Sequence, residues 1–123
     1  MEIIAKILIA FVALEHLYIA YFEMFAWETI GKKTFKSIPG DLFRPTKALA
    51  ANQGLYNGFL VAGLVWSFFI SDVSWSFNVA AFFLGCVIVA GIYGAITADR
   101  KIFFTQAAPA ILALTVLLFA YKF

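Results

Sequence analysis

Four stretches of the chain are almost continuously apolar, and each is long enough to cross a lipid bilayer as a helix. They cover residues 3–27, 48–70, 77–98 and 102–121. A spanning helix needs about 20 apolar residues to cross a hydrocarbon core of about 30 Å. The pattern therefore predicts an all-α membrane protein, a four-transmembrane-helix bundle that forms one domain over residues 1–123.

Composition excludes most water-soluble classes of protein. Of the 123 residues, 64% are hydrophobic and 13% are charged, about half the charged share of a globular protein. So few charges cannot cover the exterior of a small domain, whose surface is large relative to its volume. The first apolar stretch contains Glu15 and Glu23 and is too long for a signal peptide, so we interpret it as a retained helix.

Basic residues predict which side of the membrane each connection occupies. Residues 28–47 hold five Lys and Arg residues and residues 99–101 hold two, whereas the opposite side has Lys6 and Lys122. Short basic loops stay in the cytoplasm. We therefore expect a multi-pass protein of the cell (plasma) membrane with both termini outside. Residues 28–47 are then a cytoplasmic loop, interpreted as a solvated determinant of topology near anionic headgroups.

Three polar side chains occupy the first span, where hydrocarbon offers them no partner. At 100° per residue, Glu15, His16 and Glu23 share one arc of the helix. A charge in the middle of the bilayer costs about 2.5–3.5 kcal/mol, which nearly cancels the gain from the apolar residues of the span. We expect this arc to face the bundle interior, with Glu15 protonated, paired or in contact with water. Partners must then come from other helices.

The other spans also carry polar side chains, which gather on one face of the second and third helices and in the half nearer the cytoplasm. This placement predicts a polar cavity that opens toward the cytoplasm and is closed above by Phe and Leu. The residues predicted to bind a proton or solute are Glu15, His16, Glu23, Asn52, Gln53, Tyr56, Asn57, Tyr93, Thr97 and Gln106. The alternative is a dry network of hydrogen bonds that holds the bundle together.

Small residues form a second pattern, because they let helix backbones approach closely within a membrane. The predicted packing positions are Gly54, Gly58, Ala62, Gly91 and Gly94. The first three lie opposite the polar face of the second span and predict a close helix contact, which a homodimer could also use. We interpret the single cysteine, Cys86, as a small buried hydrophobe.

Recognised motifs for metals, phosphates and nucleic acids are absent from the sequence. One His, one Cys and the two Glu of the first span lack the spacing of a zinc or di-iron site. No glycine-rich phosphate loop and no nucleic-acid motif occurs. We therefore expect no metal, no cofactor and no nucleic-acid partner.

Three strings resemble one family of small bacterial membrane proteins over nearly the whole chain. They are ALEHLYI at 13–19, LAANQGLYNGFL at 49–60 and FLGCVIVAGIYGA at 83–95. The family is catalogued as domain of unknown function thirteen-zero-four. The resemblance implies four spans and a bacterial membrane, and it brings no established activity. Eight of the candidate residues coincide with those that the family singles out: Glu15, His16, Glu23, Asn52, Gln53, Tyr56, Asn57 and Tyr93.

Three functions agree with these patterns. The leading hypothesis is a non-enzymatic protein that binds or moves a small molecule through the polar cavity, with Glu15 changing its protonation. The second is a membrane-embedded enzyme that acts on a lipid or quinone-like substrate, with Glu15 and His16 as acid and base. The third is a helper subunit that uses its small residues to bind another membrane protein. Proton movement in vesicles, substrate turnover and co-purification would distinguish them.

Overall fold

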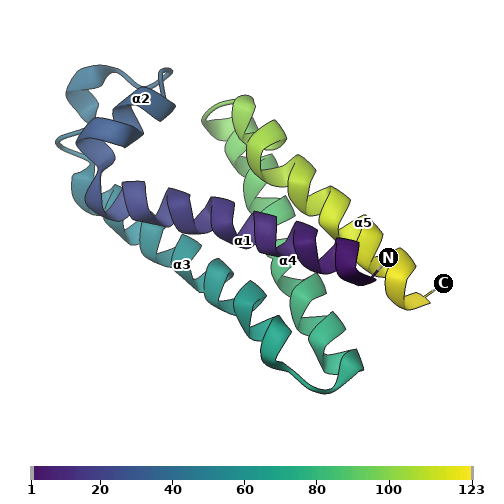
Figure 1. Ribbon diagram of the computed structural model, residues 1–123. Coiled ribbons are helices and arrows are strands. Elements are labelled where there is room, and N and C mark those ends of the chain that lie inside the picture. The colour runs from purple at the N-terminus through teal and green to yellow at the C-terminus, as the bar shows by residue number, and fades with distance from the viewer. Residues whose placement is uncertain (1, 123) are drawn as a thin grey trace.

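The computed structural model describes residues 2–122, which are built from helices (Figure 1). The long helices are α1 (Glu2–Phe25), α3 (Lys47–Phe69), α4 (Val73–Thr97) and α5 (Ala108–Lys122). Shorter helical segments connect them: a π-helix at Trp27–Gly31, α2 (Lys32–Thr34), a 3-10 helix at Gly40–Leu42 and a second π-helix at Phe103–Ala107. No strand occurs between residues 2 and 122, so the all-α prediction is confirmed. Positions 1 and 123 of the predicted domain lie outside the described residues.

Three helical segments are long and apolar enough to cross a membrane. They are Glu2–Phe25, Val73–Thr97 and Phe103–Tyr121, of which the last joins the second π-helix to α5. Helix α3 matches the second predicted span and has 23 residues, but it carries the three amides Asn52, Gln53 and Asn57 and is not one of the three. The helices therefore suit a membrane protein.

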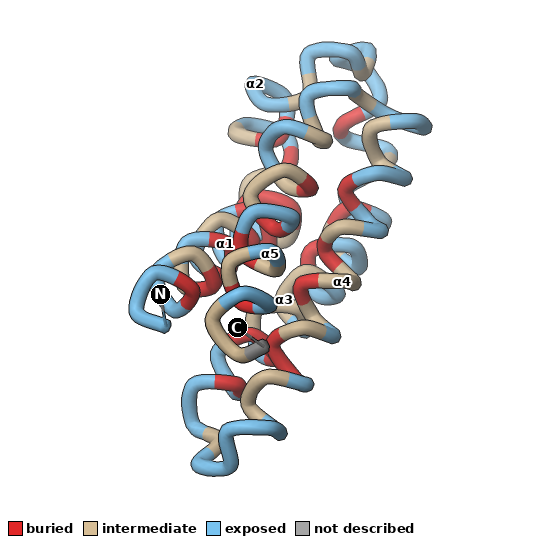
Figure 2. Tube along the Cα trace, turned by 90° about the vertical axis from the view of Figure 1, so that its right-hand side faces the viewer, coloured by how far each residue is buried: buried red, intermediate tan, exposed pale blue. Residues whose placement is uncertain are grey.

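Large apolar side chains cover much of the exterior. Phe69 is 80% exposed and Ile96 is 79% exposed. Buried positions, red in Figure 2, lie mainly where helices face one another. Apolar surface left in water costs about 25 cal/mol per Å², and a hydrocarbon environment removes this cost. The exposed side chains thus agree with a protein surrounded by lipid.

The long helices form two antiparallel pairs, α1 with α3 and α4 with α5. Helix α1 also packs on α5, and α3 also packs on α4. One buried cluster joins all four helices in the half nearest the chain termini and includes Val12, Leu64, Leu84 and Ala113. In the other half, the buried cluster joins only α1, α3 and their connection. The two pairs therefore diverge toward the end that carries α2, as Figure 1 shows.

Local sequence explains where the helices of the second pair begin. The side chain of Asp72 accepts a hydrogen bond of 2.9 Å from the backbone N–H of Trp75, a standard cap for the first turn of α4. Before α5, the backbone widens into the π-helix Phe103–Ala107. Pro109 follows this turn and has no N–H, so it cannot donate to the carbonyl of Thr105.

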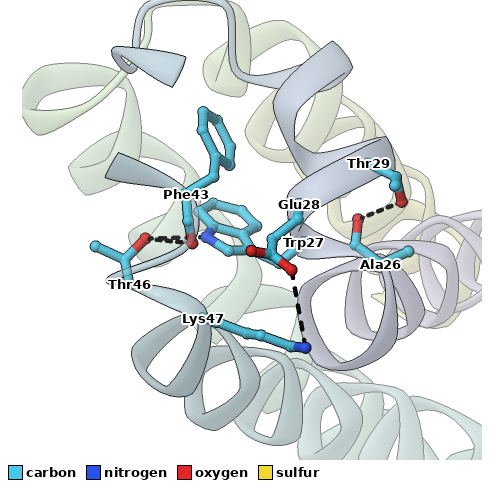
Figure 3. A network of polar contacts seen from close by, with 7 residues as sticks. All are labelled: Ala26, Trp27, Glu28, Thr29, Phe43, Thr46 and Lys47. Atoms are coloured by element: carbon cyan, nitrogen blue, oxygen red, sulfur yellow. Dashed lines mark hydrogen bonds and ion pairs between the residues drawn. The ribbon is translucent and has the colours of Figure 1, made fainter. Parts of the chain in front are cut away.

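Residues 28–47 are mostly exposed, as a solvated loop would be, but a few of their side chains pack against the helices. Phe43 is only 2% exposed, and its ring lies 4.9 Å from that of Trp27. The indole N–H of Trp27 donates a 3.0 Å hydrogen bond to Thr46 Oγ1, and Lys47 pairs with Glu28 at 3.9 Å (Figure 3). A small aromatic core of Trp27, Phe35 and Phe43 therefore anchors a segment that is otherwise mostly exposed.

Candidate functional site

A pocket of about 790 Å³ lies where the two helix pairs diverge. Its walls come from the second half of α1, the folded segment 27–46, the first half of α3, the second half of α4 and the π-helix before α5. Small-molecule sites commonly have volumes of about 300–1,000 Å³. The pocket is therefore large enough to hold a small organic molecule.

Most of the wall is apolar, and a minority of side chains can form hydrogen bonds. The apolar part includes Ile19, Phe35, Leu42, Leu60 and Ile102. Seven of the ten residues predicted to bind a proton or solute line the pocket: Glu23, Gln53, Tyr56, Asn57, Tyr93, Thr97 and Gln106. Side chains from four separate helical regions thus converge on one space.

A hydrogen bond between Glu23 and Asn57 links α1 to α3 at the pocket wall. The Asn57 Nδ2 group donates to Glu23 Oε1 at 2.5 Å, and Glu23 is 2% exposed. One turn earlier on α3, a Cβ on Gly54 would lie 2.9 Å from the carbonyl oxygen of Ala20. The glycine therefore lets the two helices approach closely, beside the pair of polar side chains rather than on the opposite face of α3.

Glu15 and His16 do not line the pocket. His16 is 1% exposed, and its Nδ1 lies 2.9 Å from the carbonyl oxygen of Val12, on its own helix. Glu15 Oε2 is buried and has no hydrogen-bond partner among residues 2–122. The expectation that other helices supply the partners is wrong for these two residues and correct for Glu23. A shared arc of one helix does not ensure a shared neighbour, because α1 packs on different helices along its length.

The tyrosines of the pocket are more exposed than the carboxyl group. Tyr56 is 64% exposed and Tyr93 is 69% exposed. Thr97 donates a 2.8 Å hydrogen bond to the carbonyl of Tyr93 within α4. Asn52 lies outside the pocket and donates to the carbonyl of Ala48 at 2.8 Å. Its amide is satisfied by its own helix.

The small residues of α4 pack against the π-helix and the residue that precedes it. A Cβ on Gly91 would lie 2.8 Å from the Cβ of Ala107. A Cβ on Gly94 would lie 3.1 Å from Ile102 Cγ2. Both positions therefore support the close approach that the sequence predicted, and Gly94 also lines the pocket.

The small residues of α3 divide into two groups. A Cβ on Gly58 would meet no atom within 4 Å among the described residues, and Ala62 is exposed. The buried contact lies instead at Gly63, where a Cβ would collide with the ring of Phe83 on α4. The spacing of small residues along the helix predicted the packing positions. The crossing of α3 and α4 decides which glycine is buried against the neighbouring helix.

Comparison with known proteins identifies the family. Residues 10–118 match the family described as protein of unknown function (DUF1304). The chain belongs to this family. It is similar to "Uncharacterized protein YpaA" of Lactococcus lactis subsp. lactis (strain IL1403), with 36% identity over 116 residues, which are 93% of this chain and 96% of the relative. No solved structure matches the chain. The resemblance drawn from the sequence strings is thus confirmed.

In this DUF1304 member, sequence reasoning missed one wall of the pocket. Phe35, Ile38, Leu42 and Thr46 come from the segment that the charge pattern assigned to solvent, and Trp27 ends the first predicted span. Apolar residues recur through this segment between the basic ones, which is the signal of a packed face. The single cysteine, Cys86, also lines the pocket and is half-buried rather than fully buried.

Proposed function

We propose that the chain is a multi-pass membrane protein that binds a small molecule in the pocket and exchanges a proton at Glu23 as it does so. Glu23 takes the role that sequence reasoning gave to Glu15, because Glu23 lines the pocket and Glu15 does not. The proton released from the carboxyl group passes to water at the pocket mouth. The observation that carries the proposal is the pocket, which combines apolar walls with a buried carboxyl group.

We further propose that all four long helices cross the membrane, with both termini outside. The polar side chains of α3 argue little against this, because Gln53, Tyr56 and Asn57 line the pocket and Asn52 bonds its own helix. The pocket then opens at the cytoplasmic end, where the basic residues gather. Reporter fusions at the two termini test the topology. A cytoplasmic report from the C-terminal fusion would contradict it.

Binding can be tested with three para-substituted phenols of similar shape and different charge. They are para-hydroxyphenyltrimethylammonium, para-tert-butylphenol and para-hydroxybenzenesulfonate. The protein is reconstituted in lipid nanodiscs and titrated with each phenol by calorimetry, with empty nanodiscs subtracted. The proposal predicts saturable binding of at least one phenol with one site per chain. It is overturned if none binds saturably.

Two matched variants show whether binding occurs in the pocket. Ala90 and Ala62 are both exposed alanines, and only Ala90 lines the pocket. Ala90→Trp places a bulky ring in the pocket, whereas Ala62→Trp leaves it open. We expect Ala90→Trp to lose binding and Ala62→Trp to keep it. Equal binding by both variants would place the bound molecule elsewhere.

Proton exchange needs its own measurement. In weakly buffered nanodiscs with a pH indicator, saturation with the tightest-binding phenol should release at most about one proton per chain. Glu23→Gln should release none, because the amide has no proton to exchange in this range. Equal release by both proteins would exclude Glu23 as the exchanging group.

The helper hypothesis depends on a separate surface. A Cβ on Gly58 would meet no atom within 4 Å among residues 2–122 and Ala62 is exposed, so that face of α3 is open to a second membrane protein. The mass of the purified protein, measured by light scattering with and without Gly58→Leu, tests association of two copies. An unchanged monomer mass in both samples would argue against a homodimer.

A further inference from the structure

We infer that the pocket takes an amphiphilic organic cation, whose positive group contacts the Glu23 carboxyl group and whose apolar part lies against the surrounding wall. This inference rests on the proposed function, because it names the class of molecule that the same pocket binds. It is argued from the charges, the free hydrogen-bonding capacity and the aromatic residues of the wall.

The pocket wall carries an acidic side chain and no basic one among the described residues. Glu23 is its only carboxyl group, and no Lys, Arg or His belongs to the described residues that line it. The nearest basic residue in sequence to the α3 wall, Lys47, points to Glu28 at 3.9 Å and lies outside the lining. A bound anion would therefore face a buried acid with no compensating cation, which is costly where water is scarce.

The helix ends around the pocket do not reverse this preference. Helices α1 and α4 end at the pocket, and their C-termini carry partial negative charge. Helix α3 and the segment leading into α5 begin there, and their N-termini carry partial positive charge of similar size. Because two ends of each sign surround the pocket, the side-chain charge decides its preference.

The Glu23 carboxyl group keeps capacity for a ligand. Asn57 donates to Oε1, and no other hydrogen bond reaches this carboxyl group among residues 2–122. Glu23 lines the pocket, so Oε2 can accept from a donor placed there. A charge-assisted hydrogen bond from an ammonium group would use this oxygen, and a quaternary ammonium would be held by charge alone.

Aromatic rings and apolar residues favour an organic cation over a metal ion. Trp27, Phe35, Tyr56 and Tyr93 line the pocket and can each present a ring face or edge to a ligand. Ring faces attract cations, and they do so most effectively for weakly hydrated ammonium groups. A small metal ion would lose its water to a wall that offers one carboxyl group and otherwise only neutral amide and hydroxyl oxygens. The volume of about 790 Å³ also far exceeds the space that a bare ion fills.

The three phenols described above test the inference, because their shapes are alike and their charges differ. We expect the trimethylammonium phenol to bind at least about tenfold more tightly than its uncharged tert-butyl analogue, and the sulfonate to bind most weakly. Glu23→Gln should reduce this preference to less than about threefold while the uncharged phenol binds as before. The Gln side chain can still accept the hydrogen bond from Asn57, so the α1–α3 contact is kept.

A second variant keeps the test decisive if Glu23→Gln does not fold. Gln53 is an exposed residue of the wall, and Gln53→Lys adds a positive charge without disturbing the buried pair. We expect Gln53→Lys to lower the affinity for the cationic phenol and to leave the affinity for the uncharged phenol nearly unchanged. Equal affinity of the cation and its uncharged analogue would overturn the inference while leaving the binding function in place. Failure of all three phenols to bind would overturn both.

Discussion

Gly54 packs α3 against α1, and a single methyl group there tests the packing beside the pocket. The Cβ of Gly54→Ala would lie 2.6 Å from Met24 Cγ, 2.9 Å from the carbonyl oxygen of Ala20 and 3.0 Å from Glu23 Cβ. The Met24 side chain can move aside at little cost. The Ala20 carbonyl belongs to the backbone of α1, so relief of this contact requires the two helices to separate.

Gly58 supplies the matched control, because it lies one turn further along α3 and a Cβ there meets no atom within 4 Å. Replacement of glycine by alanine raises helix propensity by about 1 kcal/mol at either position, so this gain cancels in the comparison. Overpacking of a close contact costs about 1–3 kcal/mol. We therefore expect the free energy of unfolding of Gly54→Ala to lie about 1–3 kcal/mol below that of Gly58→Ala.

The assay is equilibrium unfolding in mixed micelles, in which a denaturing detergent is titrated against a mild one and helix content is followed by circular dichroism. Both variants are compared with the native chain under the same conditions. Equal free energies of unfolding for Gly54→Ala and Gly58→Ala would refute the packing of α3 on α1 described here. A lower value for Gly58→Ala would show that this face is covered in the folded protein.

The same assay checks three further changes. Asn57→Leu should lower the free energy of unfolding by about 1–3 kcal/mol, because it leaves the buried Glu23 carboxyl group without its donor, and an unchanged value would show that the bond is not formed. Trp27→Phe and Thr46→Val should each lower the free energy of unfolding by about 0.5–1.5 kcal/mol, because either change removes the hydrogen bond between the two side chains, and an unchanged value for Thr46→Val would contradict that bond. Glu15→Leu should raise stability by about 1–3 kcal/mol, because it removes a buried oxygen with no partner, whereas a loss of stability would reveal a partner for that oxygen.

Helical periodicity was enough to predict polar faces on the helices, and it located most of the polar side chains of the pocket but few of its apolar ones. It put Glu23 and Asn57 on interior faces but did not select this pair, because four polar residues of the second span were equally available as partners. Periodicity could not separate Glu23 from Glu15 and His16. That distinction depends on where the α1–α3 pair diverges from α4–α5, and a crossing angle is a property of packing between helices rather than of one helix.

The basic segment shows a second limit of the sequence. Lys and Arg counts concern the cost of moving charges across a membrane, and they say nothing about apolar residues between those charges. Phe43 packs with residues of α1 and α3 even though Arg44 follows it directly in the sequence. Its neighbours Phe35, Ile38 and Leu42, in the same connection, form part of the pocket wall.

Cys86 provides the most direct test of the central claim that the pocket is a ligand site, because it is the single cysteine of the chain and lines the pocket. The rate at which a small maleimide alkylates Cys86 is measured in nanodiscs by mass spectrometry, with and without saturating para-hydroxyphenyltrimethylammonium. We expect the ligand to slow alkylation severalfold, and Ala90→Trp to react at a rate that the ligand does not change. An alkylation rate in the native protein that is the same with and without ligand would contradict the account.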